Sequence, residues 1–232
     1  IKGSYAVDPQ KGAVVMTLTT QGDVPIHYTL DGSEPTAASP RYTGPVEIGK
    51  SARFRATALR EGGENASYSR EFAFSKSTGR PAVLNTKPND SYTFEGASLL
   101  VDGYHSRPVF TSGAWLGYLD EPLDVTIDMG GEQSYRSVEL ETLAEKGDWI
   151  FPPSSVTVWV SDNGTDFTEV ASVAVPEAKA GDADGIGRYR MQFPETSARY
   201  LKVVAQNAAA IPAWHPGAGS KGFLFVDEVV VE

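Results

Sequence analysis

The sequence predicts an all-β protein made of two antiparallel β-sandwiches in tandem. Apolar and polar residues alternate with a period of two almost throughout the 232 residues, as in 14–19 and 156–161. Turn signals that contain glycine, such as 31–32, 130–131 and 163–164, separate these runs, and no long stretch has helical spacing. Strict alternation indicates strands with one buried face, and many short strands between turns are typical of sandwiches.

A break in the pattern divides the chain into two parts. The segment 75–81 is polar, contains Gly and Pro, and follows the apolar strand pattern at 72–74. A chain of 232 residues has room for one large or two small domains. We therefore expect a small domain at 1–76 and a larger one at 80–232. The opening residues 1–5 carry no signal-peptide pattern, and we expect them to begin at a cut from a longer protein.

Composition excludes several classes of partner. The formal net charge is −10 at pH 7, whereas binding of nucleic acid needs a clustered positive surface, so neutral ligands or cations are expected instead. No apolar run is long enough to span a bilayer. Cysteine is absent, which removes disulfides, thiolate metal sites and cysteine nucleophiles.

Two tryptophans in loops are the most informative candidates for binding. Trp214 and His215 stand in the Gly/Pro-rich loop 213–222, and Trp149 stands in the loop 146–153. Loops on a rigid scaffold often carry binding groups. An exposed indole in a loop either plugs a local gap or forms a stacking platform for a ligand. With two such indoles among polar neighbours, both interpretations stay open.

The sequence around the motifs argues against nucleotide binding and catalysis. Residues 44–51 match the phosphate-loop pattern, but that loop must lead into a helix, and 52–57 alternates as a strand. The sequence contains three histidines and no G-x-S-x-G nucleophile elbow. We therefore predict no nucleotide site and no catalytic residues.

Particular phrases resemble two known families. The phrase 28–36, with 42–45 after it, resembles the small β-sandwich that follows the barrel in chitobiase-type β-hexosaminidases. The second domain resembles the discoidin, or coagulation factor 5/8 C-type, fold used by family 32 carbohydrate-binding modules. Its signatures are 101–103, Trp115, 125–130, 161–164 before Phe167, and 227–229. Together the two modules look like the C-terminal tail of a bacterial family 20 glycoside hydrolase.

The resemblance implies a fold, a location and partners. It implies a small immunoglobulin- or fibronectin-like sandwich followed by a discoidin-like jelly roll. The chain would be a non-catalytic accessory region of a secreted, periplasmic or cell-surface bacterial enzyme. Its partners would be glycans, with terminal Gal, GalNAc or GlcNAc, and the catalytic barrel of the parent enzyme, a β-N-acetylhexosaminidase.

The resemblance also implies site residues. A structural Ca²⁺ would be held by Asp102, by main-chain carbonyls around Leu100 and Tyr104, and by Glu228. The family often has Thr or Ser five positions after the Asp, where this chain has Arg107, with Ser106 one position earlier. Sugar contacts in the family come from His, Arg, Asn and aromatic residues of variable loops. The candidates by residue type and position are His105, Arg107, Trp149, Trp214 and His215.

Two functions of different classes therefore remain. The second domain binds glycans, or the chain is a structural or protein-interaction tail that packs on the catalytic barrel and binds no sugar. The two differ in what they require of Trp149 and Trp214. Glycan binding requires both indoles to be exposed together in one cleft, whereas a structural tail would bury them separately.

Overall fold

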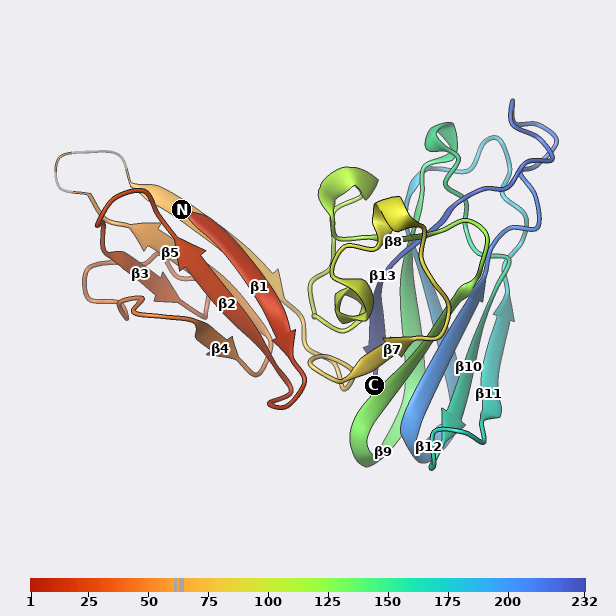
Figure 1. The fold of residues 1–232 in the computed structure, drawn as a ribbon, viewed down its shortest axis with the longest axis horizontal. Helices are drawn as coiled ribbons and strands as arrows, with labels where there is room; N and C mark the ends of the chain where they lie inside the picture. Colours follow the sequence, from red (N-terminus) through yellow and green to blue (C-terminus); the bar gives the residue numbers. More distant parts are fainter. Residues whose placement is uncertain (61, 63–64) are drawn as a thin grey trace.

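The computed structural model describes residues 1–60, 62 and 65–232. These residues form strands and short 3-10 helices without an α-helix, which confirms the predicted all-β class. Figure 1 shows two β-domains that follow one another along the long axis of the molecule. None of the helices in this described part is long and apolar enough to cross a membrane.

The first domain is a sandwich of two three-stranded antiparallel sheets, ordered β1-β2-β4 and β3-β5-β6. Its strands are β1 (Lys2–Asp8), β2 (Ala13–Thr19), β3 (Ile26–Thr29), β4 (Val46–Ile48), β5 (Ala52–Ala58) and β6 (Ala66–Phe72). Alternate residues such as Met16 and Phe54 are buried in one core between the sheets. The strand predicted at 52–57, after the stretch that matches the phosphate-loop pattern, is confirmed as β5.

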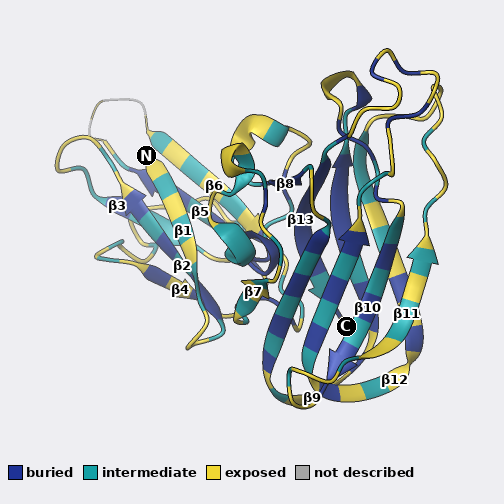
Figure 2. Ribbon diagram, turned by 45° about the vertical axis from the view of Figure 1, so that its right-hand side comes forward, coloured by how far each residue is buried: buried dark blue, intermediate teal, exposed yellow. Residues whose placement is uncertain are grey.

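The second domain contains one sheet of seven strands with the path β11-β10-β12-β9-β13-β8, to which β7 adds by pairing with β9. The strands are β7 (Ala82–Leu84), β8 (Leu116–Tyr118), β9 (Leu123–Ala144), β10 (Ser155–Ser161), β11 (Thr168–Ala174), β12 (Gly185–Gln206) and β13 (Leu224–Val231). Figure 2 shows buried and more exposed residues alternating along β9 and β12. The predicted period of two therefore corresponds to a sheet with one face on the core.

The prediction of a turn at 130–131 is wrong, because β9 runs through it. Gly130 has a positive φ of 80°, and its amide donates to Oδ1 of Asp128 at 2.9 Å. The pairing of β9 with β12 shifts register here, between Ala198 and Tyr200. The glycine pair thus makes an irregularity inside a long strand, a role that glycine also serves in β-bulges.

The described residues contain four short 3-10 helices outside the sheets, and the sequence did not predict them. They are η1 (Asp90–Tyr92), η2 (Gly96–Leu100), η3 (Phe110–Ser112) and η4 (Lys146–Asp148). The first three lie in the long connection between β7 and β8, which also carries Asp102 and Arg107. The fourth opens the loop that carries Trp149.

The middle of the polar segment between the domains, residues 77–79, is buried and hydrogen-bonded. Ser77 is fully buried, and its hydroxyl donates to the carbonyl of Val229 at 2.5 Å. The amide of Gly79 donates to the carbonyl of Val101 at 2.8 Å. A Cβ on Gly79 would lie 2.4 Å from the carbonyl carbon of Gly12 in the first domain. This segment therefore packs tightly between the two domains.

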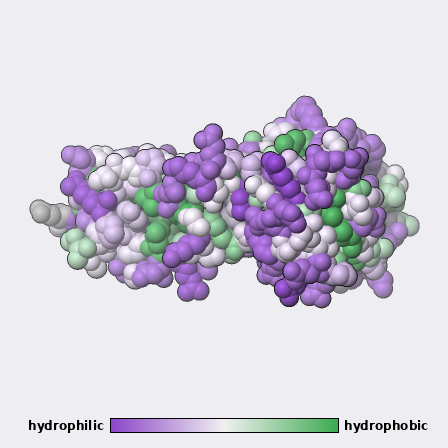
Figure 3. Space-filling model, turned by 90° about the horizontal axis from the view of Figure 1, so that it is seen from below, coloured by the Kyte–Doolittle hydropathy of each residue, from purple (hydrophilic) through white to green (hydrophobic). Residues whose placement is uncertain are grey.

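The outer surface agrees with the high net charge. Figure 3 shows one face of the molecule, which is mostly hydrophilic with small apolar areas on both domains. Exposed large apolar residues of the described chain include Val83, Val109, Trp149 and Trp214. The two tryptophans belong to the same end of the second domain.

Candidate functional site

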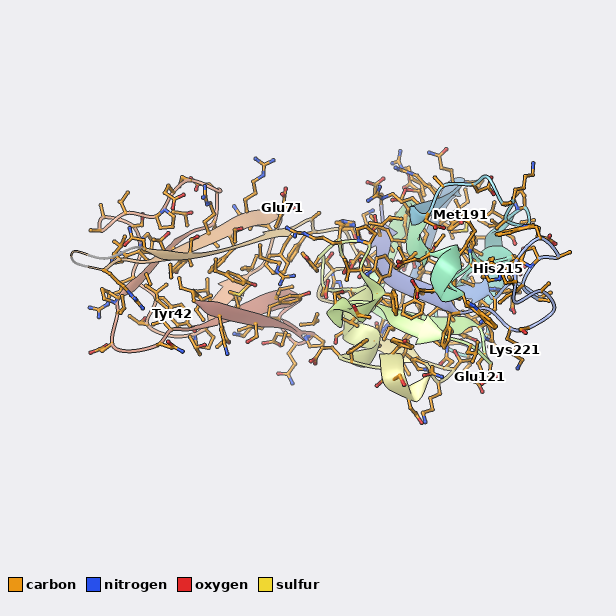
Figure 4. The ribbon with its side chains drawn as sticks, turned by 90° about the horizontal axis from the view of Figure 1, so that it is seen from above. Tyr42, Glu71, Glu121, Met191, His215 and Lys221 are labelled. Atoms are coloured by element: carbon orange, nitrogen blue, oxygen red, sulfur yellow. The ribbon has the colours of Figure 1, made fainter. Side chains whose placement is uncertain are left out.

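An aromatic cluster, consisting of Trp149, Phe151, Trp214 and His215, lies at one end of the second domain. Trp149 follows η4, and Trp214 and His215 lie in the loop between β12 and β13. Figure 1 shows η4 and this loop at the same end of the sandwich, and Figure 4 labels His215 there. Trp149 is 42% exposed and Trp214 is 39% exposed, so the structure brings two accessible indoles to one end.

His215 lies between the aromatic rings. Its ring centroid is 6.0 Å from that of Trp149, 5.6 Å from that of Trp214 and 5.5 Å from that of Phe151, each pair nearly perpendicular. Edge-to-face pairs of this kind are favourable beyond the area they bury. A single imidazole thus fixes the relative position of both indoles.

Both ring nitrogens of His215 are used inside the protein. Nδ1 accepts from the amide of Gly217 at 3.0 Å, so Nε2 carries the proton and donates to the carbonyl of Lys146 at 2.9 Å. The side chain is also buried. The sequence predicted His215 as a candidate sugar contact; in the structure both of its ring nitrogens are bonded to the backbone, as a buried imidazole requires. Its role here is to support the indoles.

The two indoles differ in whether their N–H group is available to a ligand. Nε1 of Trp214 donates to the carbonyl of Ala178 at 2.9 Å, so its N–H is not available to a ligand, although the ring remains accessible. For Trp149, no hydrogen bond of the indole nitrogen is found within the described residues. A Cβ on Gly217 would lie 2.8 Å from Cζ2 of Trp149, so this glycine lets the indole pack against the loop backbone.

Trp149 has an unusual backbone conformation. Its φ is 65°, in the left-handed region that a bulky residue rarely adopts. Its amide donates to the carbonyl of Lys146 at 3.0 Å, and its carbonyl accepts from the amide of Phe223 at 2.8 Å. Backbone strain of this kind costs on the order of 1–3 kcal/mol and concentrates at binding and catalytic sites.

An apolar pocket of about 420 Å³ adjoins the cluster. It shares Phe151 with the cluster, and its wall includes Ala178, whose carbonyl holds the Trp214 indole, and Ala213, which precedes Trp214. The other lining residues are Pro152, Pro153, Ser154, Val175, Pro176, Glu177, Ala208, Ala209, Ala210, Ile211 and Pro212. Volumes of about 300–1,000 Å³ are usual for small-molecule sites.

A second group of functional candidates is a carboxylate cluster, consisting of Asp102, Glu141, Asp227 and Glu228, each no more than 3% exposed. A β-bulge creates it. Val226 pairs with Thr142 and Val229 with Leu140, so Asp227 and Glu228 together face the single residue Glu141 of β9. Two residues against one is the mark of a bulge, which re-aims side chains and here buries both members of an acidic pair.

Three oxygens of the cluster accept hydrogen bonds from backbone amides of the connection between β7 and β8. Oδ1 of Asp102 accepts from the amide of Tyr104 at 2.7 Å, and Oδ2 of Asp227 accepts from the amide of Ser106 at 2.7 Å. Oε1 of Glu228 accepts from the amide of Gly103 at 3.2 Å. Oε2 of Glu228 is buried and has no hydrogen-bond partner among the described residues.

Burial makes these carboxylates hard to ionise. It raises the pKa of Asp102 to about 7, and, together with the neighbouring carboxylates, it raises the pKa of Glu228 well above its usual range. Burial likewise raises the pKa of Asp227. Glu141 differs, because hydrogen bonds from His105 and Arg188 outweigh burial and lower its pKa. Neither Asp102 nor Glu228 forms an ion pair with a Lys or Arg side chain of the described residues, although buried carboxylates ordinarily require one.

The carboxylate cluster fits a cation only in combination with main-chain oxygens. Among residues 1–60, 62 and 65–232, no three His, Asp or Glu side chains are placed to hold a metal ion by themselves. The unpartnered Oε2 of Glu228 is the feature that favours a cation. Leu100 and Tyr104 flank Asp102 closely in the chain, and their carbonyls are the kind of oxygen ligand that Ca²⁺ accepts.

His105 and Arg107 do not join the aromatic cluster. They line an interdomain groove with residues of the first domain. Nδ1 of His105 lies 3.0 Å from Oε2 of Glu141, and the hydrogen bond to Glu141 raises the pKa of His105. The carbonyl of Arg107 accepts from Nε1 of the buried Trp115 at 2.9 Å. The five candidate sugar contacts thus fall into two separate groups.

Sequence reasoning missed several residues of both groups. Asp227 stands beside Glu228 in an apolar strand, and this acidic pair was the available signal for it. Phe151 lies two residues after Trp149, a weaker signal. The carbonyls of Lys146 and Ala178 have no signal in the sequence, since any residue type carries one.

Comparisons with known proteins find solved structures of low sequence identity. No curated protein has a matching sequence. A chitosan-binding module from a chitosanase/glucanase of Paenibacillus sp. IK-5 is 17% identical, with a TM-score of 0.44 over 68% of this chain and 98% of the module. CpGH89CBM32-5 from Clostridium perfringens, solved in complex with GalNAc-β-1,3-galactose, is 16% identical, with a TM-score of 0.45 over 66% of this chain and 94% of that one.

Family comparisons assign both parts of the chain. The chitobiase/beta-hexosaminidase C-terminal domain family matches residues 3–70, as the resemblance of the first domain predicted. The F5/8 type C domain family matches residues 85–221, which is more than half of the chain. The chain therefore belongs to the F5/8 type C domain family, with a chitobiase/beta-hexosaminidase C-terminal domain before it.

Proposed function

We propose that the second domain binds glycans through the aromatic cluster. The observation that carries this proposal is that Trp149 and Trp214 are both accessible while one buried histidine fixes them. Indoles that only filled gaps would be covered. The family 32 module from Clostridium perfringens was solved with a GalNAc-containing disaccharide, which supports a sugar as the ligand class here. Terminal Gal, GalNAc or GlcNAc is the proposed specificity.

The chemistry of the cluster suits a neutral sugar. A pyranose presents C–H groups on one face, and these pack on an indole while the hydroxyls reach polar groups at its edge. The adjoining apolar pocket, with Phe151 and the neighbouring prolines, extends the surface available for such packing. A neutral ligand also suits a chain of net charge −10, because no charge complementarity is needed. Affinity of a single shallow site is expected to be about millimolar to micromolar.

A structural Ca²⁺ is the second part of the proposal. Asp102, Glu228 and the carbonyls of Leu100 and Tyr104 would hold it. The ion would supply positive charge to two buried carboxylates and would complete the unpartnered oxygen of Glu228. The role of these residues is to bind the ion and to fix the β7–β8 connection against the bulge of β13.

The chain as a whole is proposed to serve a β-N-acetylhexosaminidase whose catalytic barrel lies outside this sequence. The match of residues 3–70 to the chitobiase/beta-hexosaminidase C-terminal family supports this parent. In this role the chain itself is non-catalytic and works outside the cytoplasm, where glycan substrates are attached to surfaces. Binding through a second module raises the effective concentration of the attached enzyme on such a surface.

The alternative is a structural or protein-interaction tail that binds no sugar. One observation favours it. Both ring nitrogens of His215 and the indole N–H of Trp214 form hydrogen bonds with the protein backbone, so they are not available to a ligand. In that case the exposed indoles would contact the catalytic barrel. The exposed faces of both rings and the adjoining pocket favour the glycan over this alternative.

A glycan array with the isolated chain, followed by titration calorimetry on the best ligand, tests the proposal. Trp149→Ala and Trp214→Ala are each expected to reduce affinity about tenfold or more, which corresponds to about 1.4 kcal/mol. Trp159→Ala is the matched control. Trp159 lies on β10, on the opposite face of the strand from the buried core valines, and it is not part of the aromatic cluster. If no glycan binds the wild-type chain and both loop variants unfold, the structural alternative is correct.

A further inference from the structure

A groove between the two domains is lined by polar and charged side chains of both. Its volume is about 650 Å³. The first domain contributes Arg53 and Arg55 from β5 and Arg70 from β6, and the second domain contributes Tyr104, His105 and Arg107. Figure 4 labels Glu71, the neighbour of Arg70, on the first domain with the second domain beside it.

The concentration of arginine here is unusual for this chain. Its formal net charge is −10, yet four of its 20 Lys and Arg residues line this one groove. Two of the four are already paired with carboxylates: Arg53 lies 3.2 Å from Glu71, and Arg55 lies 2.5 Å from Glu34. Both pairs are exposed, and exposed pairs of this kind are weak, so a competing anion can replace either carboxylate.

Arg70 and Arg107 carry the positive charge that remains. Neither forms an ion pair with a carboxylate of the described chain. The guanidinium of Arg70 stacks over the ring of Tyr104, 4.0 Å from its centroid, and Nε donates to the hydroxyl of Tyr68 at 3.2 Å. Stacking orients the planar guanidinium while leaving its other donors unused. The Arg107 side chain is exposed.

We propose that this groove binds an anionic saccharide, one that carries carboxylate or sulfate groups. The guanidinium group presents paired N–H donors whose geometry matches the two oxygens of either anion. Donors from β5, β6 and the loop after Gly103 converge on one concave space, which suits a compact ring-bearing ligand better than an extended peptide. Its volume also falls within the range of about 300–1,000 Å³ that is usual for small-ligand sites.

The site requires both domains in their present arrangement. Neither the first-domain arginines nor Arg107 would enclose a ligand alone. The junction holds them together, since the amide of Ala73 donates to the carbonyl of Gly103 at 2.7 Å and the segment at Ser77 is buried. This site is separate from the aromatic cluster, so the inference does not rest on the function proposed above.

Titration calorimetry of the whole chain with defined tetrasaccharides tests the proposal. The ligands are a hyaluronan tetrasaccharide, which carries carboxylates only, a chondroitin sulfate tetrasaccharide, which adds sulfates, and neutral chitotetraose. We expect one or both anionic sugars to bind the groove and to weaken as salt rises, because the contacts are ionic. The stronger of the two identifies which anion the arginines prefer.

Matched variants locate the binding. Arg107→Gln and Arg70→Gln should each weaken binding of the anionic sugar at least about fivefold, since each removes a charge-assisted donor pair. Arg41→Gln, an exposed arginine of the first domain outside the groove, should change nothing. Arg70 packs at the junction, so Arg107→Gln decides the result if the Arg70 variant melts early.

Three results would overturn the proposal. The first is absence of binding by both anionic tetrasaccharides at low salt. The second is an equal loss of affinity in Arg41→Gln, which would mean non-specific attraction. The third is binding of a hexaglutamate peptide as tight as that of the sugars, with the same loss of affinity in the variants. That result would mean that the groove is a site for acidic peptides.

Discussion

The hydroxyl of Tyr5, on the first strand of the small domain, donates a hydrogen bond of 3.1 Å to Oδ2 of Asp102 in the second domain. Burial and the neighbouring Asp102 raise the pKa of Tyr5 well above its usual value, so the hydroxyl stays protonated and donates. The ring of Tyr5 also packs on Tyr104, with centroids 6.0 Å apart. One residue of the first domain thus contacts the carboxylate cluster of the second.

Removing this hydroxyl should weaken the whole chain. Tyr5→Phe keeps the ring but leaves Oδ2 of the buried Asp102 without its donor, and an unsatisfied buried polar group costs about 1–3 kcal/mol. Urea unfolding of the chain in EDTA measures the loss. Tyr28→Phe is the control, because no hydrogen bond of that hydroxyl is found among the described residues. Equal losses in the two variants would show that the contact to Asp102 contributes nothing.

Gly217 should contribute to glycan binding through its close contact with the Trp149 indole. A Cβ at this position would lie 2.8 Å from Cζ2 of Trp149, so Gly217→Ala must displace the indole or the loop. We expect affinity for the glycan to fall about tenfold with a changed tryptophan fluorescence spectrum. Gly147→Ala is matched, since a Cβ there meets no atom within 4 Å. Unchanged affinity in Gly217→Ala would exclude Trp149 from the binding surface.

Calcium should stabilise the chain through the carboxylate cluster. A ligand that binds only the folded state adds stability as RT ln(1 + [L]/Kd), about 2.7 kcal/mol at a hundredfold excess over Kd. Melting in EDTA and then in excess Ca²⁺ measures this shift. Glu228→Gln removes one charged ligand and should abolish most of the shift, whereas Glu232→Gln at the exposed end of the chain should keep it. A melting midpoint that is the same in EDTA and in excess Ca²⁺ would refute the calcium site.

The Asp128–Arg199 pair should add to acid sensitivity. Nε of Arg199 donates to Oδ1 of Asp128 at 3.0 Å and Nη2 donates to Oδ2 at 2.8 Å, and these bonds lower the pKa of Asp128. A lowered pKa means that the stabilising charge is fully present above the unfolded value, about 3.9, and is lost as pH falls through the folded pKa.

Asp128→Asn therefore tests the pair through the pH dependence of unfolding. The variant should be less stable than the wild type at pH 7, and the difference should shrink as the pH falls below about 4. Because Arg199 is largely exposed, the difference is expected to be small. Asp166→Asn, in an exposed turn between β10 and β11, serves as the control. A difference that does not depend on pH would mean that the carboxylate acts through packing and not through its charge.

Alternation in the sequence was sufficient to predict most of the strands. The patterns at 14–19 and 156–161 correspond to β2 and β10, because a strand that buries one face must alternate. Local sequence signals predicted the backbone conformation less well where contacts with distant segments determine it. Gly130 and its neighbour read as a turn, but they lie inside β9, at a break in its pairing with β12 between Asp128 and Gln133. The 3-10 helices of the β7–β8 connection likewise depend on contacts with distant strands.

By itself, the sequence determined the all-β class, the family resemblance of both modules and the residue types available for binding. Only the tertiary structure decided how those residues combine. The bulge in β13 buries Asp227 beside Glu228. Both ring nitrogens of His215 form hydrogen bonds with the backbone, which fixes the imidazole between Trp149 and Trp214. Hydrogen-bond partners and register are set by segments far apart in the chain, and alternation of residue types carries no record of them.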